Sequence, residues 1–366
     1  MRLLVVNAGS SSLKLRVLGP DDTVEASLDL DAPAGRLDEA AVATALASFG
    51  NVEAVGHRIV HGGTRFQAPV RIDGRVVAGL EALVDLAPLH LPKSLAALRL
   101  VGRLLPDTPA VACFDTAFHA GLPPAAATYA IPREWRERWD LRRFGFHGLS
   151  HAYAARRAAA LAGRTDGDGF RVVTCHLGAG ASLAAVLDGR SVDTTMGFTP
   201  LEGLVMATRS GSLDPGLVLW LEEHVGMPPA ELASTLEHRS GLLGLAGTAD
   251  MRAIVAGTAA GRAEPRLALD IYLHRLRGEI ARMVAALGGL DALVFTGGVG
   301  EHAPVVRAGA ADGLAFLGIR LDADANAGAG LPDREIGTPG APVRSFVIEA
   351  REDLEIARQV RAVLAG

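Results

Sequence analysis

The chain has 366 residues, of which 49% are hydrophobic and 21% charged, and its formal net charge is -5. This length predicts two domains, and the charge balance argues against a nucleic-acid partner and offers no basic tract for an anionic membrane surface. No apolar run approaches membrane-spanning length and no signal peptide is recognisable, so we expect a cytoplasmic protein without a membrane partner.

Strand-like and helix-like segments alternate along the chain. Residues 2–7 and 12–18 read as two strands around a turn, and 54–63 reads as a strand followed by a glycine turn. Residues 91–105 have helical apolar spacing, and 109–116 reads as a buried strand. This alternation predicts an α/β protein.

An internal repeat suggests two related halves. The stretch "LLVVNAGSSSLKLRVLG" (3–19) resembles "VVTCHLGAGASLAAVLDG" (172–189), and the alignment pairs Asn7 with His176. Each stretch contains an apolar strand, a glycine-rich turn and a second strand. We therefore expect each half to open with a strand–turn–strand hairpin, although two hairpins can also resemble each other by chance.

The end of the chain predicts an amphipathic helix over residues 351–366. The apolar stripe of this helix would comprise Leu354, Ile356, Ala357, Val360, Val363 and Leu364.

A domain boundary is expected within residues 117–150, which are loop-like and helix-like.

Three glycine-rich turns follow apolar strands, and each could hold a phosphate. "NAGSSSLK" (7–14) combines glycine and small hydroxyls with Lys14, a mobile charge suited to phosphate oxygens. "CHLGAGAS" (175–182) and "FTGGVGE" (295–301) offer backbone N–H groups. Each turn alone is a weak indication, because glycine turns are common, but three of them in one α/β chain favour a nucleotide.

Several charged side chains follow or interrupt apolar strands. Asp115 directly follows a strand, where it could be a catalytic carboxylate or a helix cap. Arg58 on an apolar strand predicts an anionic partner, either an internal carboxylate or a ligand. Arg209 lies in a Gly/Ser-rich loop typical of an anion site. His147 and His151 are four residues apart, but no third ligand accompanies them, so charge stabilisation by His147 is favoured over metal binding.

Rare residue types add a further indication. Lysine and asparagine are scarce in this arginine-rich chain, and we expect the few that remain to be enriched in chemical roles. They are Lys14, Lys93, Asn7, Asn51 and Asn326. Cys113 and Cys175 match no metal spacing, and we expect buried free thiols rather than a disulfide.

Taken together, these stretches closely resemble the acetate/propionate kinase family, or acetokinases. "VNAGSSSLK" and "RFGFHGLSH" are similar to its two signature segments, and "GHRIVHGG", "FDTAFH", "HLGAGAS", "DTTMGFTPLEGLVMATRSG" and "FTGGVGE" occur in the family's order. The resemblance covers essentially the whole chain. It implies the duplicated, ribonuclease H-like fold of sugar kinases, heat-shock 70 chaperones and actin, with two domains around a cleft.

The resemblance also implies an activity. The family transfers the γ-phosphoryl group of ATP to a short-chain carboxylate, so we expect acetate and ATP to give acetyl phosphate and ADP with Mg²⁺ or Mn²⁺. A homodimer is expected from the family alone. An N-terminal domain (1–118 plus 353–366) would hold the substrate, the metal and the phosphate hairpin, and a C-terminal domain (119–352) would bind the nucleotide and dimerise.

By resemblance, five side chains would form the reaction centre. Asp115 would be the essential carboxylate, with an orienting role, and His147 and Arg209 would stabilise the transferring phosphoryl group. Asn7 and Glu352 would hold the metal.

The resemblance further implies three sets of ligand-binding residues. Arg58 would bind the substrate carboxylate, and the pocket for its alkyl end would comprise Val60, Leu89, Phe146 and Pro200. Phosphate contacts would come from Lys14, Ser10 and Ser12. The remaining nucleotide contacts would come from His176, Leu177, Gly178, Ala179, Gly180, Asp250, Met251, Arg252, Gly297, Gly298, Val299, Gly300 and Glu301.

The chain departs from the family pattern at Leu91, Leu149, Ala179, Ser212 and His302. Ala179 stands where the family has an asparagine that could contact the nucleotide, which leaves the affinity for the phosphate donor open. Within the family, the alternatives are a propionate kinase, a butyrate kinase, for which Leu91 and Leu149 would make the surroundings more apolar, or a member that uses pyrophosphate.

A different class of function is a nucleotide-binding module like the chaperones and actins of this fold. Such a module would need to clamp ATP, but it would not need the carboxylate-binding Arg58.

Overall fold

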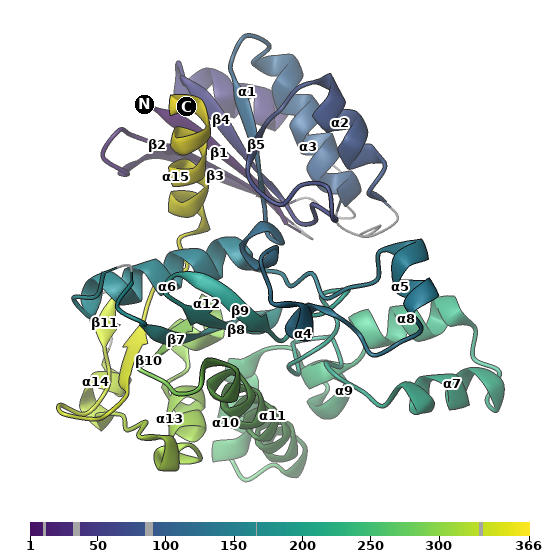
Figure 1. The fold of residues 1–366 in the computed structure, drawn as a ribbon, viewed down its shortest axis with the longest axis vertical. Helices are drawn as coiled ribbons and strands as arrows, with labels where there is room; N and C mark the ends of the chain where they lie inside the picture. The colour runs from purple at the N-terminus through teal and green to yellow at the C-terminus, as the bar shows by residue number, and fades with distance from the viewer. Residues whose placement is uncertain (10–11, 32–36, 85–90, 166, 329–331) are drawn as a thin grey trace. The chain divides into compact units, whose positions relative to one another are not determined.

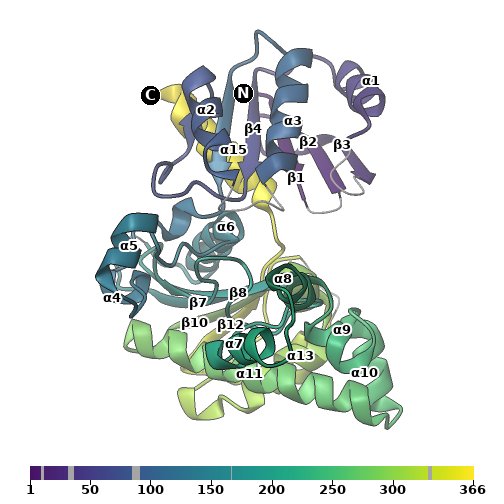
Figure 2. The same ribbon diagram turned by 90° about the vertical axis from the view of Figure 1, so that its right-hand side faces the viewer.

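The computed structural model describes residues 1–9, 12–31, 37–84, 91–165, 167–328 and 332–366. The chain forms two compact α/β units (Figures 1 and 2). Unit 1 contains Met1–Ala120, Phe146–Tyr153 and Arg351–Gly366. Unit 2 contains Gly121–Gly145 and Ala154–Ala350.

The sheet of unit 1 has six strands in the order β3-β2-β1-β4-β6-β5. The central strands β1, β4 and β6 are parallel, whereas β2, β3 and β5 join them in antiparallel pairs. The strands are β1 (Leu3–Ala8), β2 (Ser12–Leu18), β3 (Val24–Asp31), β4 (Ala54–Ile59), β5 (Val70–Arg71) and β6 (Ala110–Phe114).

Helices cover both faces of this sheet. Successive residues of β1 point to opposite faces, so the strand contributes side chains to the core on each side. Leu4 and Val6 pack with residues of α1 (Glu39–Phe49) and α3 (Leu91–Leu104). Leu3 and Val5 pack with α15 (Glu352–Ala365), which Figure 2 shows on the other side of the strands from α1. A further helix, α2 (Gly74–Glu81), packs beside α3.

The sheet of unit 2 repeats this topology. Its order, β9-β8-β7-β10-β12-β11, places every strand six numbers after its counterpart in unit 1, with the same parallel and antiparallel pairings. This confirms the expected duplicated fold. The strands are β7 (Arg171–Leu177), β8 (Ala181–Leu187), β9 (Arg190–Thr194), β10 (Ala292–Thr296), β11 (Arg334–Glu335) and β12 (Arg344–Val347).

Most of the helical residues of unit 2 lie after its first hairpin. The longest of the described helices, α11 (Ala263–Leu287), packs against β8. None of the described helices combines the length and apolarity needed to cross a membrane. The remaining helices are α4 (Pro124–Ala127), α5 (Arg133–Trp139), α6 (Gly148–Leu161, which begins in unit 1), α7 (Pro215–Glu223), α8 (Pro229–His238), α9 (Gly241–Ala246), α10 (Met251–Ala259), α12 (Gly297–His302), α13 (Pro304–Asp312) and α14 (Ala323–Ala327).

The units differ from the expected domain limits by two residues at each boundary, since 119–120 and 351–352 belong to unit 1, and by one internal segment. Residues 146–153 were expected in the C-terminal domain, but they cluster with unit 1. The Gly148 N–H donates to the carbonyl of Asp115 at 2.9 Å, and Leu149 packs in the core of unit 1 beside Cys113. These contacts hold the start of α6 against the end of β6.

The predicted hairpins, the helix over 91–105 and the strand over 109–116 are confirmed within one or two residues at their ends. Both cysteines are buried free thiols, as expected.

Candidate active site

An arginine–carboxylate pair lies at one edge of the sheet of unit 1. Arg58 is near the end of β4, and Asp115 directly follows β6, so the parallel strands bring the two residues to the same edge. Arg58 Nε donates to Asp115 Oδ1 at 3.0 Å, and Nη2 donates to Oδ2 at 2.6 Å. Asp115 is 1% exposed. The anionic partner that the sequence predicted for Arg58 is therefore an internal carboxylate, held in a two-point contact.

Two further residues extend this pair into a network of four. Arg58 Nη1 donates to Asn7 Oδ1 at 3.0 Å, and Asn7 Nδ2 donates to Glu352 Oε2 at 3.1 Å. Glu352 Oε2 also lies 3.7 Å from Arg58 Nη1. The four residues come from β1, β4, the end of β6 and the start of α15, although they are up to 345 positions apart in the sequence.

The pKa values of Asp115 and Arg58 are set by burial and by the neighbouring charges together. Burial raises the pKa of Asp115, whereas the neighbouring Arg58 guanidinium acts to lower it. Burial alone would lower the pKa of Arg58, but Asp115 and Glu352 raise that pKa above its usual range. The network thus holds one guanidinium beside two carboxyl groups.

The oxygen atoms of this network fit a hard divalent cation. Mg²⁺ is usually held by one or two carboxylates, and water and substrate phosphates supply its other ligands. Glu352 offers such a carboxylate, and Asn7 has an amide oxygen that accepts from Arg58 while its nitrogen faces Glu352. Among the described residues, no group of three or more His, Cys, Asp or Glu could form a metal site by itself.

The β1–β2 hairpin places a cation beside this network. Lys14 on β2 lies opposite Asn7 in the antiparallel register, and it is exposed between the buried Leu13 and Leu15. Gly9 N–H closes the turn by donating to the carbonyl of Ser12 at 2.8 Å. Ser10, a predicted phosphate contact, lies outside the described residues.

The start of α6 brings two predicted residues close to Asp115. His147 precedes the helix with φ of +55°, and Gly148 follows it against the Asp115 carbonyl. A Cβ at Gly148 would lie 2.1 Å from that carbonyl oxygen, so glycine is required for this approach. Phe146 is 1% exposed, and its own carbonyl is 3.1 Å from His119 Nε2.

The structure describes three of the four residues that were predicted to form the alkyl pocket. Val60 and Phe146 are buried in unit 1, and Pro200 is half-buried in unit 2. Leu89 lies outside the described residues.

A cavity of about 910 Å³ in unit 2 collects many of the predicted nucleotide contacts. It is lined by seven of them, Gly178, Ala179, Asp250, Met251, Arg252, Gly298 and Val299. The other six predicted nucleotide residues of unit 2 lie outside its lining, namely His176, Leu177, Gly180, Gly297, Gly300 and Glu301.

Local backbone contacts shape the walls of this cavity. Gly178 N–H donates to the Gly180 carbonyl at 3.0 Å in the β7–β8 turn. Asp250 caps α10 by accepting from the N–H of Arg252 at 2.9 Å, and the two side chains form an ion pair at 3.0 Å. Gly297 has φ of +77° and lies against Leu177.

The sequence prediction missed one side of the cavity. The rest of the lining comprises apolar residues of α10, Tyr272 of α11, the segment 302–305, Ala207, Leu242 and Ala249. Val255 and Ala256 carry no signal beyond helical periodicity. Only His302 stood out in the sequence, as a departure from the family pattern.

Arg209 has an internal partner in unit 2. Its Nε donates to Glu237 Oε1 at 2.6 Å, and both side chains are largely buried. Its Nη1 lies 4.0 Å from the sulfur of Met206.

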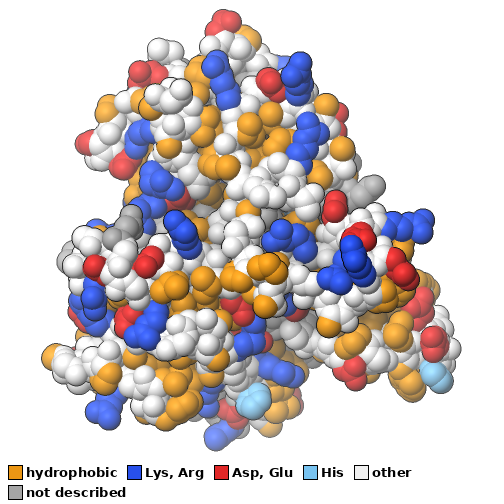
Figure 3. Space-filling view, in the orientation of Figure 1, with side chains coloured by type: hydrophobic (Ala, Val, Ile, Leu, Met, Phe, Trp, Pro, Cys, Tyr) orange, Lys and Arg blue, Asp and Glu red, His pale blue; other side chains and the backbone are white. Residues whose placement is uncertain are grey.

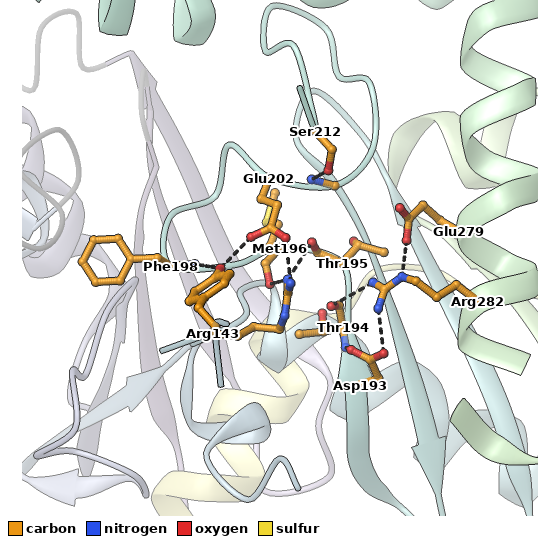
Figure 4. Close-up of polar contacts among 12 residues, drawn as sticks. Arg143, Asp193, Thr194, Thr195, Met196, Phe198, Glu202, Ser212, Glu279 and Arg282 are labelled. Atoms are coloured by element: carbon orange, nitrogen blue, oxygen red, sulfur yellow. Dashed lines mark hydrogen bonds and ion pairs between the residues drawn. The ribbon is translucent and has the colours of Figure 1, made fainter. Parts of the chain in front are cut away.

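A polar network that the sequence prediction missed fixes the loop that carries Pro200 (Figure 4). Arg143 donates to Glu202 at 2.6 Å and to the carbonyls of Thr195 and Met196 at 3.1 and 3.0 Å. Tyr129 donates to the other carboxylate oxygen of Glu202 at 2.6 Å. Both flanks of the loop are thus tied to one arginine.

Comparison with known proteins matches this chain to one family. A model described as the Acetokinase family matches residues 34–358. The acetate kinase of Leifsonia xyli subsp. xyli is 44% identical over 395 aligned positions that cover 100% of this chain and 99% of the relative. The acetate kinase of Pseudothermotoga lettingae is 45% identical over 314 residues, which cover 86% of this chain and 77% of the relative.

Solved structures agree with the sequence relatives. The acetate kinase of Porphyromonas gingivalis superposes with a TM-score of 0.91 and 34% identity, covering 99% of each chain. A propionate kinase from Francisella tularensis superposes with a TM-score of 0.90 and 34% identity, covering 98% of each chain.

Proposed function

The chain belongs to the acetokinase family, and on that premise we propose that it is an ATP-dependent kinase of short-chain carboxylates that forms acetyl phosphate and ADP from acetate and ATP. The observation that carries this proposal is the buried Arg58–Asp115 pair at the sheet edge of unit 1. A guanidinium held in this way offers a fixed anchor for a substrate carboxylate.

Arg58 keeps donors for that substrate. An arginine has five N–H donors, and three of them are engaged with Asp115 and Asn7. Asp115 thus orients Arg58 through two hydrogen bonds. Proton removal by Asp115 is not needed, because acetate is already ionised near neutral pH.

The chemical step requires positioning and charge neutralisation. A carboxylate oxygen of the substrate attacks the γ-phosphorus in line, and the bond from that phosphorus to the β–γ bridging oxygen breaks, which leaves ADP. Lys14, His147 and Arg209 supply positive charge and donors for the phosphoryl oxygens in this proposal. Bound Mg²⁺ would neutralise phosphate charge, and Asn7 and Glu352 would hold it.

Nucleotide binding is proposed for the 910 Å³ cavity of unit 2. Its lining by Gly298, Val299 and Met251, in the first turns of α12 and α10, offers backbone N–H groups and an apolar surface for a planar base. An open cavity of this volume supports ATP as the donor rather than pyrophosphate. Nucleotide binding in this cavity would not depend on the asparagine side chain that the family has at the position of Ala179.

Acetate is the first candidate acceptor, and propionate is the second. Val60 and Phe146 bury apolar surface in unit 1 that could receive a short alkyl end. One methylene contributes only about 1–3 kcal/mol of discrimination, so both acids are expected to react.

A homodimer is also proposed. The nine residues of α7 include no buried side chain, and Leu217, Leu219 and Trp220 are 45%, 54% and 51% exposed. Hydrophobic side chains reach the surface in the region of α7 (Figure 3). An apolar helix without a covering partner is typical of a subunit interface.

An acyl-phosphate assay with hydroxylamine trapping tests the proposed activity. Acetate, propionate and butyrate would each be offered with ATP and with pyrophosphate. We expect hydroxamate from acetate and propionate with ATP. A butyrate preference above about tenfold in kcat/KM, a difference of about 1.4 kcal/mol, would overturn the short-acid assignment. ATP hydrolysis without acyl phosphate would favour a nucleotide-binding module.

A further inference from the structure

A buried arginine without a carboxylate partner lies behind the nucleotide cavity. Arg307, on α13, is the largest fully buried side chain among the described residues, at 1% exposed. Within that part of the chain it forms no ion pair, and its hydrogen bonds go to neutral oxygens. Burial lowers its pKa to about 10, and the neighbouring charge of Arg334 acts in the same direction. Such a group is costly to bury, so its contacts need a physical reason.

The contacts of Arg307 converge on two short segments. Nη1 donates to the carbonyls of Gly300 and Glu301, both at 2.8 Å. Nε donates to Asn326 Oδ1 at 2.7 Å, and Nη2 donates to the Asn326 carbonyl at 2.6 Å. Asn326 Nδ2 in turn donates to the carbonyl of Pro304 at 3.0 Å.

The carbonyls of Gly300, Glu301 and Pro304 belong to the segment 298–305, most of which lines the cavity. Residues 298–299 and 302–305 line it, whereas Gly300 and Glu301 do not. Arg307 and Asn326 are not part of the lining themselves, so they hold this segment through its backbone carbonyls from outside the cavity.

The hydrogen bonds of Arg307 also satisfy carbonyl groups at the end of a short helix. α12 has six residues, and the last carbonyls of a helix lack partners within it. A guanidinium at this end supplies donors and complements the partial negative charge there. The charge of Arg307 thus stabilises α12 without a carboxylate.

We propose that Arg307 and Asn326 are positioning residues for the nucleotide, which fix the segment 298–305 in the shape that receives the phosphoryl donor. The inference rests on the proposed function of the cavity. It also gives a role to Asn326, one of three asparagines in the chain.

Three variants test the pair. Arg307→Met removes all four hydrogen bonds, and Arg307→Lys keeps the charge but not the planar fork of donors. Asn326→Asp keeps an acceptor for Arg307 but cannot donate to Pro304. Arg171→Met is the matched control, because Arg171 is a guanidinium of the same unit that pairs with Asp291 away from the cavity.

The readouts are the Kd of ATP by calorimetry and the separate KM values for ATP and acetate. For Arg307→Met we expect both ATP constants to rise at least about tenfold, or about 1.4 kcal/mol. Arg307→Lys and Asn326→Asp should raise them less, and the KM for acetate should stay within about twofold. The control should lower the melting temperature without changing the Kd of ATP.

An unchanged Kd of ATP in folded Arg307→Lys and Asn326→Asp would overturn the inference, even if Arg307→Met fails to fold. A matching rise in the KM for acetate would also overturn it, since general loosening would then explain both effects. If the wild-type protein binds ATP but forms no acyl phosphate, the proposed function fails, and the calorimetric comparison still decides the role of Arg307.

Discussion

Lys14 is the exposed cation of the β1–β2 hairpin, which makes its role separable from folding. We expect Lys14→Ala to lower kcat/KM about a hundredfold, as the loss of one donor to a transferring group often does. The free energy of unfolding should change by less than about 0.5 kcal/mol, because an exposed side chain is removed. Steady-state kinetics and urea unfolding would measure the two effects.

Arg16→Ala is the matched control for Lys14. Arg16 lies two residues further along the same face of β2 and pairs with Asp29. Full activity in Lys14→Ala, or an equal loss in both variants, would contradict a specific phosphate contact.

Single residues were predictable where their sequence neighbours set their position. Asp115 was expected at the end of a strand, and it lies there. The choice of Asp115 as partner of Arg58 was left open, because it depends on β4 and β6 being neighbours in the sheet. Tyr272 of the cavity could not be anticipated, since a tyrosine on a helix gives no sign of what it lines.

At the scale of elements, the entry into α12 offers a sharp test. Gly297 has φ of +77°, and a Cβ there would lie 2.8 Å from the carbonyl oxygen of Leu177. Gly297→Ala should therefore lower the free energy of unfolding by about 1–3 kcal/mol and raise the KM for ATP. Thermal unfolding and initial rates would measure this.

Gly298→Ala provides the control for strain at Gly297. Gly298 does not have a positive φ, and a Cβ there would meet nothing within 4 Å. Its stability should stay close to that of the wild-type protein. Equal destabilisation of both variants would contradict the close approach to Leu177 as the cause, because the higher helix propensity of alanine favours both substitutions.

Helices and strands were predictable from the sequence where the local pattern of apolar residues and glycines matches the place of the element in the fold. Both hairpins of the repeat were found from apolar runs around glycine turns. The grouping of 146–153 with unit 1 was not predicted, because it depends on Gly148 contacting Asp115, which is a distant position in the chain. The open apolar surface of α7 was also not predicted, since burial on a helix cannot be read from composition.

At the scale of the whole molecule, acid should weaken unit 1. Burial lowers the pKa of His57, His61 and His119 to about 4, from an ordinary value of 6.5. The unfolded chain then binds more protons than the folded one between these values, so stability is complete above pH 6.5 and falls as the pH approaches 4. Each histidine contributes up to about 1.4 kcal/mol per pH unit in this window.

Urea unfolding at pH 7.5 and pH 5 would measure this loss. His57→Leu should flatten the dependence by removing one of the three sites. A free energy of unfolding that is equal at the two pH values would contradict neutral burial of these histidines.

The proposed dimer makes a prediction about mass. Trp220→Glu should convert a dimer into a monomer in light scattering after size exclusion, because it places a charge on the apolar surface of α7. Trp135→Glu is the control, since Trp135 on α5 is 48% exposed against 51% for Trp220. Dissociation by both variants, or by neither, would contradict an interface at α7.

The packing of α15 on unit 1 has a consequence for synthesis on the ribosome. Leu3 and Cys113 share a core with Ile356 and Val360, and the main body of unit 2 is translated between them. At 5–20 residues per second, that interval lasts on the order of tens of seconds. During that time one apolar face of the sheet of unit 1 is not yet covered by α15, whereas unit 2 can fold as it emerges from the ribosome. The nascent chain should therefore complete its second half first, and truncation before α15 should yield a chaperone-bound first half.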